Sequence, residues 1–169
     1  MRIGKLFGLS MLTVTVFAVI LGAEVLIPQA RIFTNRSDAI KTVDAFGATL
    51  MASQHVASLR APYIGPIFQE GAATQAQLEA AAKAAKAAEG GFEAAKRAIM
   101  VLDDGAAISE NLDRAARRLK EITAAADRAM GLALAARDSA AIKGFLPGVA
   151  EVLANLEPVM NRLEARNPH

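Results

Sequence analysis

The sequence predicts an all-α protein, and two observations support this class. Its 169 residues are 53% hydrophobic but only 5% aromatic, with no tryptophan and one tyrosine. β-Sheets favour aromatic and β-branched side chains, whereas alanine, leucine, lysine, arginine and glutamate propagate helices. In addition, three long segments repeat apolar residues at alternating spacings of three and four, the pattern of helices with one buried face. A chain of this length forms one folded unit with a core of its own.

The first element is a long uncharged stretch, LFGLSMLTVTVFAVILGA, at residues 6–23. About 20 predominantly apolar residues cross a bilayer as a helix, so we expect a transmembrane anchor within residues 1–28. Arg2 and Lys5 favour a cytoplasmic N-terminus. The remainder, residues 29–169, would then form a domain outside the cytoplasm.

Two alternatives stay open for the same stretch. Leu21-Gly22-Ala23 resembles the small-residue site at which a signal peptide is cleaved. A buried core helix is the other alternative, although soluble bundles seldom contain a helix so uniformly apolar. An anchor and a signal peptide both predict that residues 29–169 are exported.

The second element is a helix near residues 29–68, continuous with the membrane segment. Ile40, Val43, Phe46 and Leu50 form an apolar seam that we expect to face the interior. Beyond this seam we expect the inward positions to be polar. They carry Ser53, Gln54, His55, Ser58, Arg60 and Tyr63.

Three further helices are expected near residues 74–103, 106–136 and 139–166. Thr74 with Gln77 predicts a capping box, Asp103-Asp104-Gly105 indicates a turn, and Asp138 can cap the last helix. The last helix has the clearest heptad: Ile142, Phe145, Val149, Val152, Leu156, Val159 and Leu163. Since short connections make neighbouring helices antiparallel, the expected architecture is an up-down-up-down four-helix bundle.

Glycine and proline should distort two of these helices. Gly90-Gly91 lies inside the second bundle helix, which we expect to kink there or to end at Glu89. In the last helix, Pro147 and Pro158, with neighbouring glycines, should bend the axis.

Several classes of function are disfavoured. The net charge of +2 is spread along the chain, so a nucleic-acid partner is not expected. Without cysteine there is no disulfide, no thiolate nucleophile and no haem attachment of the C-x-x-C-H type. His55 and His169 are the only histidines, and no Glu-x-x-His pair suggests a di-iron centre. We therefore predict no enzyme activity, metal or cofactor.

Two segments carry a family resemblance. SLRAPY at residues 58–63 is similar to the E-R-G-like segment, and LANLEPVMNRLEAR at residues 153–166 to the helix ending, of bacterial methyl-accepting chemotaxis proteins. Leu59-Arg60-Ala61 stands where that family has glutamate, arginine and glycine. The resemblance implies a periplasmic sensor domain in the bacterial inner membrane. It also implies a homodimer packed through the first and last helices, with a ligand that shifts one helix to signal a cytoplasmic module.

The polar end of the first helix is the predicted ligand site. Arg60 offers a planar fork of donors to a carboxylate or another anion, and Tyr63, Gln54 and Ser53 add hydrogen bonds, with His55 among them. The expected ligand is small and polar or anionic.

Two prolines follow Arg60 in this stretch. Pro62 and Pro66 should end or kink the helix and open room between helices. In the alternative interpretation this is a plain helix-to-turn transition. Tyr63 and Ile64 then close the top of the bundle, and Arg60 pairs with Glu70 or Glu79.

A different class of function also fits the sequence. A membrane-anchored or secreted bundle could act as a structural or protein-interaction module, binding a partner through an exposed helix face. The two hypotheses differ in whether a small ligand binds.

Overall fold

The computed structural model describes residues 37–166, which contain helices and turns and no strand. The all-α prediction is confirmed. The predicted anchor and the domain boundary at residue 28 lie outside the described residues. Within those residues, none of the helices is both long and apolar enough to span a bilayer. The description below concerns the unit that begins at Ile40.

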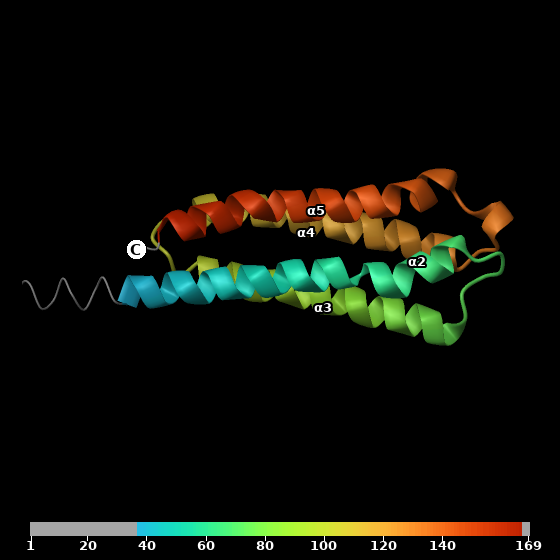
Figure 1. Cartoon of the computed structure of the whole chain (residues 1–169), viewed down its shortest axis with the longest axis horizontal. Coiled ribbons are helices and arrows are strands. Elements are labelled where there is room, and N and C mark those ends of the chain that lie inside the picture. Colours follow the sequence, from blue (N-terminus) through green and yellow to red (C-terminus); the bar gives the residue numbers. More distant parts are fainter. Residues whose placement is uncertain (1–36, 167–169) are drawn as a thin grey trace, which may run out of the picture. The chain divides into compact units, whose positions relative to one another are not determined.

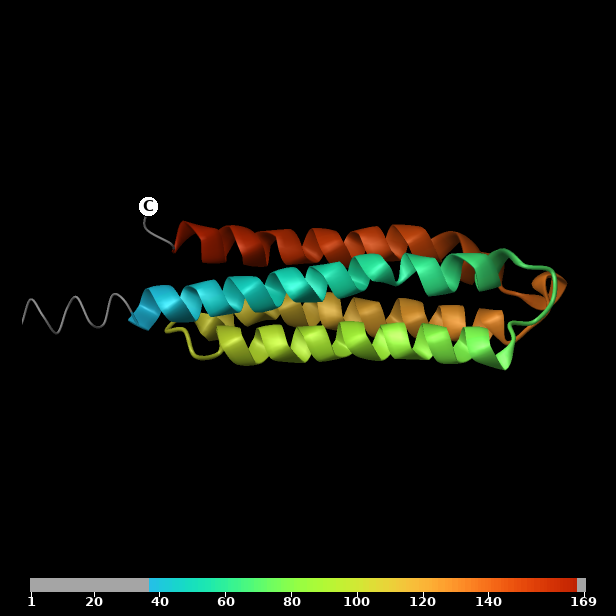
Figure 2. The same ribbon diagram turned by 60° about the horizontal axis from the view of Figure 1, so that its bottom comes forward.

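The helices follow one another with short connections. Residues 37–58 are helical, and α2 (Arg60–Phe68) follows after the single turn residue Leu59. The remaining elements are α3 (Gln75–Ile99), α4 (Gly105–Met130), the short 3-10 helix η1 (Leu134–Ala136) and α5 (Ser139–Ala165). In Figures 1 and 2 each long helix turns back alongside the one before it. Among α2, α3, α4 and α5, the most extensive contact is between α4 and α5.

Several predicted boundaries are confirmed. The Thr74 hydroxyl accepts from the Gln77 amide, and the Gln77 side chain accepts from the Thr74 amide, so the capping box is complete. Asp138 caps α5 by accepting a 2.8 Å hydrogen bond from the Ala140 amide. α4 ends at Met130, six residues before the predicted residue 136, and Gly131 is its C-cap.

α3 continues through the glycine pair at 90–91, so the alternative in which it ends at Glu89 is wrong. Gly91 instead marks a close approach of two helices: a Cβ atom there would lie 3.0 Å from the Cα of Ala52. The helix is continuous because neighbouring contacts offset the intrinsic cost of about 1 kcal/mol per glycine. α5 likewise remains a single helix through Pro147 and Pro158, which lie on its exposed side.

The inward face of the first helix is a buried seam that starts with small residues and ends with large ones. We call it the inner seam; it comprises Thr42, Ala45, Thr49, Ala52, Val56, Leu59, Tyr63 and Ile67. All eight are buried and repeat at spacings of three and four, so the phase of the helix persists across the turn at Leu59. The Thr49 hydroxyl is satisfied within the helix by the carbonyl oxygen of Ala45, at 2.8 Å.

The predicted seam of the first helix is wrong for three of its four residues. Ile40, Val43 and Leu50 are 63%, 55% and 42% exposed, whereas Phe46 is half-buried against the core. Residues two positions apart differ by about 200° around a helix axis, so the buried and exposed stripes lie on opposite faces. The smaller residues face inward because the neighbouring backbone comes so close at Gly91.

The connection between α4 and α5 is fastened to the end of α2 by a buried arginine. The Arg137 guanidinium donates to the carbonyl oxygens of Pro66, Ile67, Gly71 and Leu132, at 2.5 to 2.8 Å. Two backbone hydrogen bonds, from Ala73 to Met130 and from Leu134 to Glu70, join the same loops. These contacts hold the α2–α3 and α4–α5 connections together, at the end of the helices seen on the right in Figure 1.

Candidate functional site

The structure places the predicted ligand residues on different sides of the first helix. Tyr63 is buried, Gln54 and Arg60 are exposed, and Ser53 and His55 are half-buried. Consecutive helical residues differ by about 100° in direction, so a run such as 53–55 cannot all face one cavity. The expected inward orientation is therefore wrong for Gln54 and Arg60, as it is for the exposed Ser58. Ligand binding by these residues stays a prediction.

The alternative interpretation of this region is only partly right: Tyr63 is buried in the bundle, whereas Ile64 is exposed. Although Arg60, Glu70 and Glu79 are all described, no ion pair joins this arginine to either glutamate. The helix is interrupted at Leu59, three residues before Pro62, and then continues through Pro66 to Phe68. Pro62 lacks the amide hydrogen that would bond Ser58, which accounts for a break one turn earlier.

Tyr63 joins three helices instead of lining a pocket. Its hydroxyl donates a 2.9 Å hydrogen bond to Oδ1 of Asp127 on α4, and its ring stacks on Phe145 of α5 with centroids 4.8 Å apart. Burial, together with the Asp127 charge, raises the pKa of Tyr63 well above its ordinary value. Partial loss of hydration raises the pKa of Asp127, an effect that the Tyr63 hydrogen bond opposes. The Tyr63 hydroxyl is therefore already engaged within the protein.

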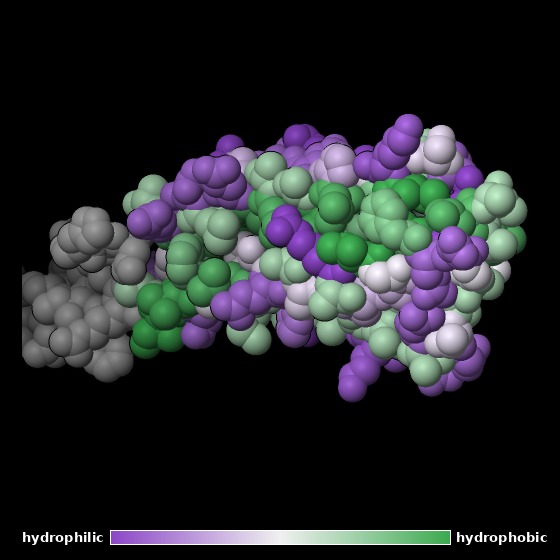
Figure 3. Space-filling view, turned by 45° about the vertical axis from the view of Figure 1, so that its right-hand side comes forward, coloured by the Kyte–Doolittle hydropathy of each residue, from purple (hydrophilic) through white to green (hydrophobic). Residues whose placement is uncertain are grey.

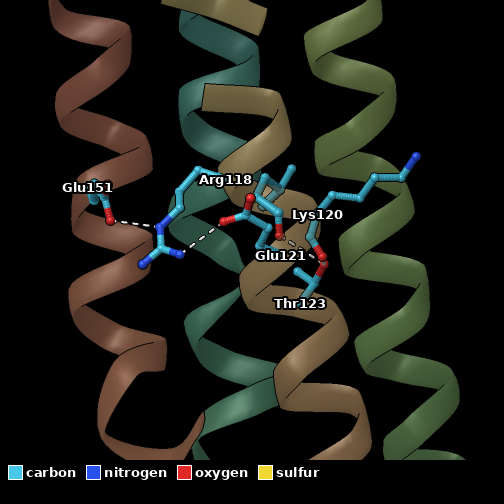
Figure 4. Close-up of polar contacts among 6 residues, drawn as sticks. Arg118, Lys120, Glu121, Thr123 and Glu151 are labelled. Atoms are coloured by element: carbon cyan, nitrogen blue, oxygen red, sulfur yellow. Dashed lines mark hydrogen bonds and ion pairs between the residues drawn. The ribbon is translucent and has the colours of Figure 1, made fainter. Parts of the chain in front are cut away.

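A polar network on the surface links α4 to α5. Nε of Arg118 donates to Glu151 on α5 at 2.7 Å, and its NH1 group donates to Glu121 at 3.1 Å (Figure 4). These hydrogen bonds raise the pKa of Arg118. The nearby Thr123 hydroxyl is satisfied by carbonyl oxygens of its own helix and takes no part.

A hollow of about 230 Å³ opens beside this network, and we call it the α4–α5 groove. Its lining comprises Arg118, Glu121, Ile122, Ala125, Asp138, Ala140, Ala141, Gly144 and Phe145. A Cβ atom added at Gly144 would meet nothing within 4 Å, so this glycine leaves part of the space open. One guanidinium and two carboxylates above an apolar floor suit a small polar molecule.

A second, smaller hollow lies between α3 and α4. It measures about 150 Å³ and is lined by Glu89, Phe92, Glu93, Ala116, Leu119 and Lys120. No ion pair joins the described side chains that line it. Within residues 37–166, no group of three histidine or acidic side chains is arranged to hold a metal ion.

The outward face of the first helix is the second candidate for function. Its residues again repeat at spacings of three and four, and we call this stripe the outer seam. The outer seam comprises Ile40, Val43, Gly47, Leu50, Gln54, Ala57, Ala61, Ile64 and Phe68, all of them exposed. Residues 45–59 contain no aspartate, glutamate, lysine or arginine. Figure 3 shows apolar side chains gathered along the face that this helix and α5 present in that view.

An exposed helix face without charges is typical of an interaction surface. Monomeric proteins rarely expose long apolar stripes, and the cores of interfaces are depleted in charged residues. By contrast, the outward residues of α3 include Lys83, Lys86, Glu89, Glu93 and Arg97. The outer seam is therefore different in kind from a solvated helix face.

Sequence reasoning missed both candidates. Arg118 and Glu121, at a spacing of three, indicate a possible ion pair on the surface of α4. Their partner Glu151 lies 33 positions from Arg118 and could not be assigned without the packing of α4 on α5. A comparison with known protein families, curated proteins and solved structures finds no match to this chain.

Proposed function

We propose that this chain is the ligand-sensing, extracytoplasmic part of a bacterial transmembrane receptor. The observation that carries the proposal is the return of α5 to the end of the described unit at which the first helix begins (Figures 1 and 2). At this end Arg166 of α5 pairs with Asp104 at the start of α4, and Arg162 donates to the carbonyl oxygen of Ala107. A displacement of α5 against the first helix therefore moves the end of the unit from which the chain continues toward the predicted membrane segment.

The proposal includes the parts that the sequence alone suggests. The helices form an up-down-up-down bundle, the first of them continues from a membrane helix at residues 6–23, and residues 29–169 lie in the periplasm. A cytoplasmic signalling module receives the displacement.

The ligand site of the proposed sensor is the α4–α5 groove. The Arg118–Glu151 ion pair crosses from α4 to α5, so a ligand that competes for either group changes the preferred register of the two helices. A ligand shifts such an equilibrium only by its differential affinity for the two arrangements.

The proposed receptor is a homodimer that packs through the outer seam. A seam with spacings of three and four lies along one side of a helix and can meet the same seam of a second copy. This arrangement buries Ile40, Val43 and Leu50, which the single chain leaves exposed. It therefore accounts for large apolar residues on the outside of a bundle.

Membrane topology can be tested with single cysteines because the chain has none of its own. Ala154→Cys on the exposed side of α5 should react with a membrane-impermeant maleimide in intact bacteria expressing the full chain. Ala88→Cys, at a buried position of α3, is the matched control and should stay unlabelled. Labelling of residue 154 only after cell lysis would contradict an extracytoplasmic location.

Ligand binding can be tested by thermal shift with small organic acids, amino acids and amines. A compound that binds the native protein raises the melting temperature in proportion to the logarithm of its concentration above Kd. Arg118→Ala should abolish the shift, whereas Arg60→Ala should leave it unchanged. If Arg60→Ala abolishes the shift and Arg118→Ala leaves it unchanged, the ligand site lies on the first helix. If no compound raises the melting temperature, the alternative function described below is favoured.

The alternative function is a structural or protein-interaction module. The uncharged outer seam supports this function as well, because it suits any partner with an apolar helix face. Cross-linking of Val43→Cys to a different protein, together with an absence of ligand-induced shifts, would favour this alternative.

A further inference from the structure

We propose that Tyr63 passes the state of the α4–α5 groove to the first helix, through its ring contact with Phe145 and its hydrogen bond to Asp127. The inference rests on the proposed function, because it takes the groove as the ligand site. It gives Tyr63 a positioning role between helices instead of the direct ligand contact predicted from the sequence.

Phe145 belongs both to the groove and to the contact with the first helix. It is among the residues that line the groove, and its ring stacks on Tyr63 with centroids 4.8 Å apart and planes inclined by 28°. Phe145 is 3% exposed and Tyr63 is fully buried. Because a closely packed interior leaves little free volume around two such rings, a displaced Phe145 presses on Tyr63. An occupant of the groove that moves Phe145 therefore acts on the first helix.

Tyr63 also contacts the second helix that forms the groove. Its hydroxyl donates a 2.9 Å hydrogen bond to Oδ1 of Asp127. Asp127 lies on α4, the helix that contributes Ile122 and Ala125 to the groove lining. The phenol thus bridges the two helices, with its hydroxyl on α4 and its ring on α5. Any change in the separation or register of α4 and α5 alters at least one of these two contacts.

The end of α2 is held in place about one helical turn beyond Tyr63. There the Arg137 guanidinium donates to the carbonyl oxygens of Pro66 and Ile67, at 2.8 and 2.5 Å. Arg137 directly precedes Asp138, which caps α5 and lines the groove. Because this buried guanidinium ties the end of α2 to the start of α5, the phenol is not free to move away from the groove.

A side chain at Gly144 can imitate an occupied groove without a ligand. Gly144 lines the groove, and a Cβ atom added there would meet nothing within 4 Å. Gly144→Leu therefore places an apolar side chain in the open space beside Phe145. The response can be read at one residue, since the chain has a single tyrosine and no tryptophan. A carboxylate that accepts a hydrogen bond from a phenol quenches its fluorescence, so the fluorescence yield measures the bond between Tyr63 and Asp127.

The test uses the full chain purified in detergent. Tyrosine fluorescence should rise in Gly144→Leu toward the yield of Asp127→Asn, which lacks the carboxylate. Gly144→Ala should keep the wild-type yield, because its Cβ atom meets no neighbour. Gly47→Leu is the matched control: it also adds a side chain where nothing lies within 4 Å, on the exposed face of the first helix, and should have no effect. Hydrogen exchange at residues 52–62 should be faster in Gly144→Leu than in the other two glycine variants.

Circular dichroism first establishes that Gly144→Leu is folded. If it is not, Arg118→Ala takes its place with the same expectation, since it breaks the ion pair between α4 and α5 without adding bulk. An unchanged fluorescence yield in the folded variant overturns the inference. A changed yield with unchanged hydrogen exchange in the first helix overturns it as well, because the effect then ends at Tyr63.

These outcomes are distinct from those that decide the proposed function. The side chain at position 144 replaces the ligand, so a failure of the inference leaves the thermal-shift test of ligand binding untouched. Conversely, an absence of thermal-shift hits would remove the groove as a ligand site, while the fluorescence of the Gly144 variants would still show whether Tyr63 responds to it.

Discussion

The inner and outer seams of the first helix have the same residue spacing, but the inner seam is buried and the outer seam is exposed. Both alternate at three and four, and both are mostly apolar. The buried inner seam starts with threonines and alanines, whereas the exposed outer seam starts with isoleucine, valine and leucine. The comparison shows that the larger apolar residues do not always mark the face that enters a bundle.

The reason lies in the distance between backbones. At Ala52 the first helix comes so close to Gly91 of α3 that a single Cβ on the glycine would lie 3.0 Å from the Cα of Ala52. On α5, Gly148 leaves room for the Ile122 side chain of α4, since an added Cβ would lie 2.5 Å from it. Close packing of this kind selects small side chains, because interiors have little free volume. The large apolar residues Ile40, Val43 and Leu50 of the same helix lie on its exposed outer seam.

The largest expected difference in the free energy of unfolding is between alanine variants of two leucines in the first helix. Leu59→Ala, on the inner seam, should lower the free energy of unfolding by about 2–5 kcal/mol, because it leaves a cavity. Leu50→Ala, on the outer seam, should change it by at most about 0.5 kcal/mol in dilute solution. Urea denaturation of the purified chain measures both. If the destabilisation by Leu50→Ala grows with protein concentration, the outer seam packs against a second copy of the chain. If the two variants are equally destabilised in dilute solution, the assignment of Leu59 to the buried face and Leu50 to the exposed face is wrong.

Two arginines extend the same contrast to polar residues. Arg137→Ala should cost about 2–3 kcal/mol, since it leaves buried carbonyl oxygens of the α2–α3 connection without donors. Arg60→Ala, at an exposed position, should stay within about 0.5 kcal/mol. Hydrogen exchange should show faster exchange at residues 66–73 in the Arg137 variant alone. Unchanged exchange there would mean that the loops are held by other contacts.

Overpacking tests the close approach directly. Ala52→Leu should destabilise the protein by about 1–3 kcal/mol, because the new methyl groups meet the backbone at Gly91. Ala57→Leu makes the same change on the outer seam and should stay within about 0.5 kcal/mol for the single chain. Thermal melting at low concentration compares the two. A tolerated leucine at position 52 would show that the helices can move apart.

The smallest effect concerns Tyr63 and depends on pH. Tyr63→Phe should cost about 0.5–1.5 kcal/mol at neutral pH, since it removes the hydrogen bond to Asp127. Folding raises the pKa of Tyr63 above its ordinary value of 10.0, so the native state retains a proton that the unfolded chain releases. The advantage of the wild type is therefore complete below pH 10 and declines as the pH rises further. Urea titrations between pH 7 and 11 should show the two proteins converging, and a constant difference would contradict the buried phenol.

Part of the site could be inferred from the sequence and part could not. The prediction that Tyr63 faces inward is confirmed. Its partners Asp127 and Phe145 are 64 and 82 positions away, and nothing local indicates them. Arg137 follows the predicted end of a helix, where an arginine is ordinary. Only the meeting of two loops makes it the buried donor to four carbonyl oxygens.

The sequence by itself determined the helical class, the capping box at Thr74, the cap at Asp138 and the heptad of α5. These features depend on residues within one or two turns of each other, where propensity and hydrogen bonding act locally. The tertiary structure decided which stripe of the first helix is buried, whether Gly90-Gly91 breaks α3, and which arginine enters the interior. Each of these depends on how closely another helix approaches, and that distance is set by residues far away in the chain.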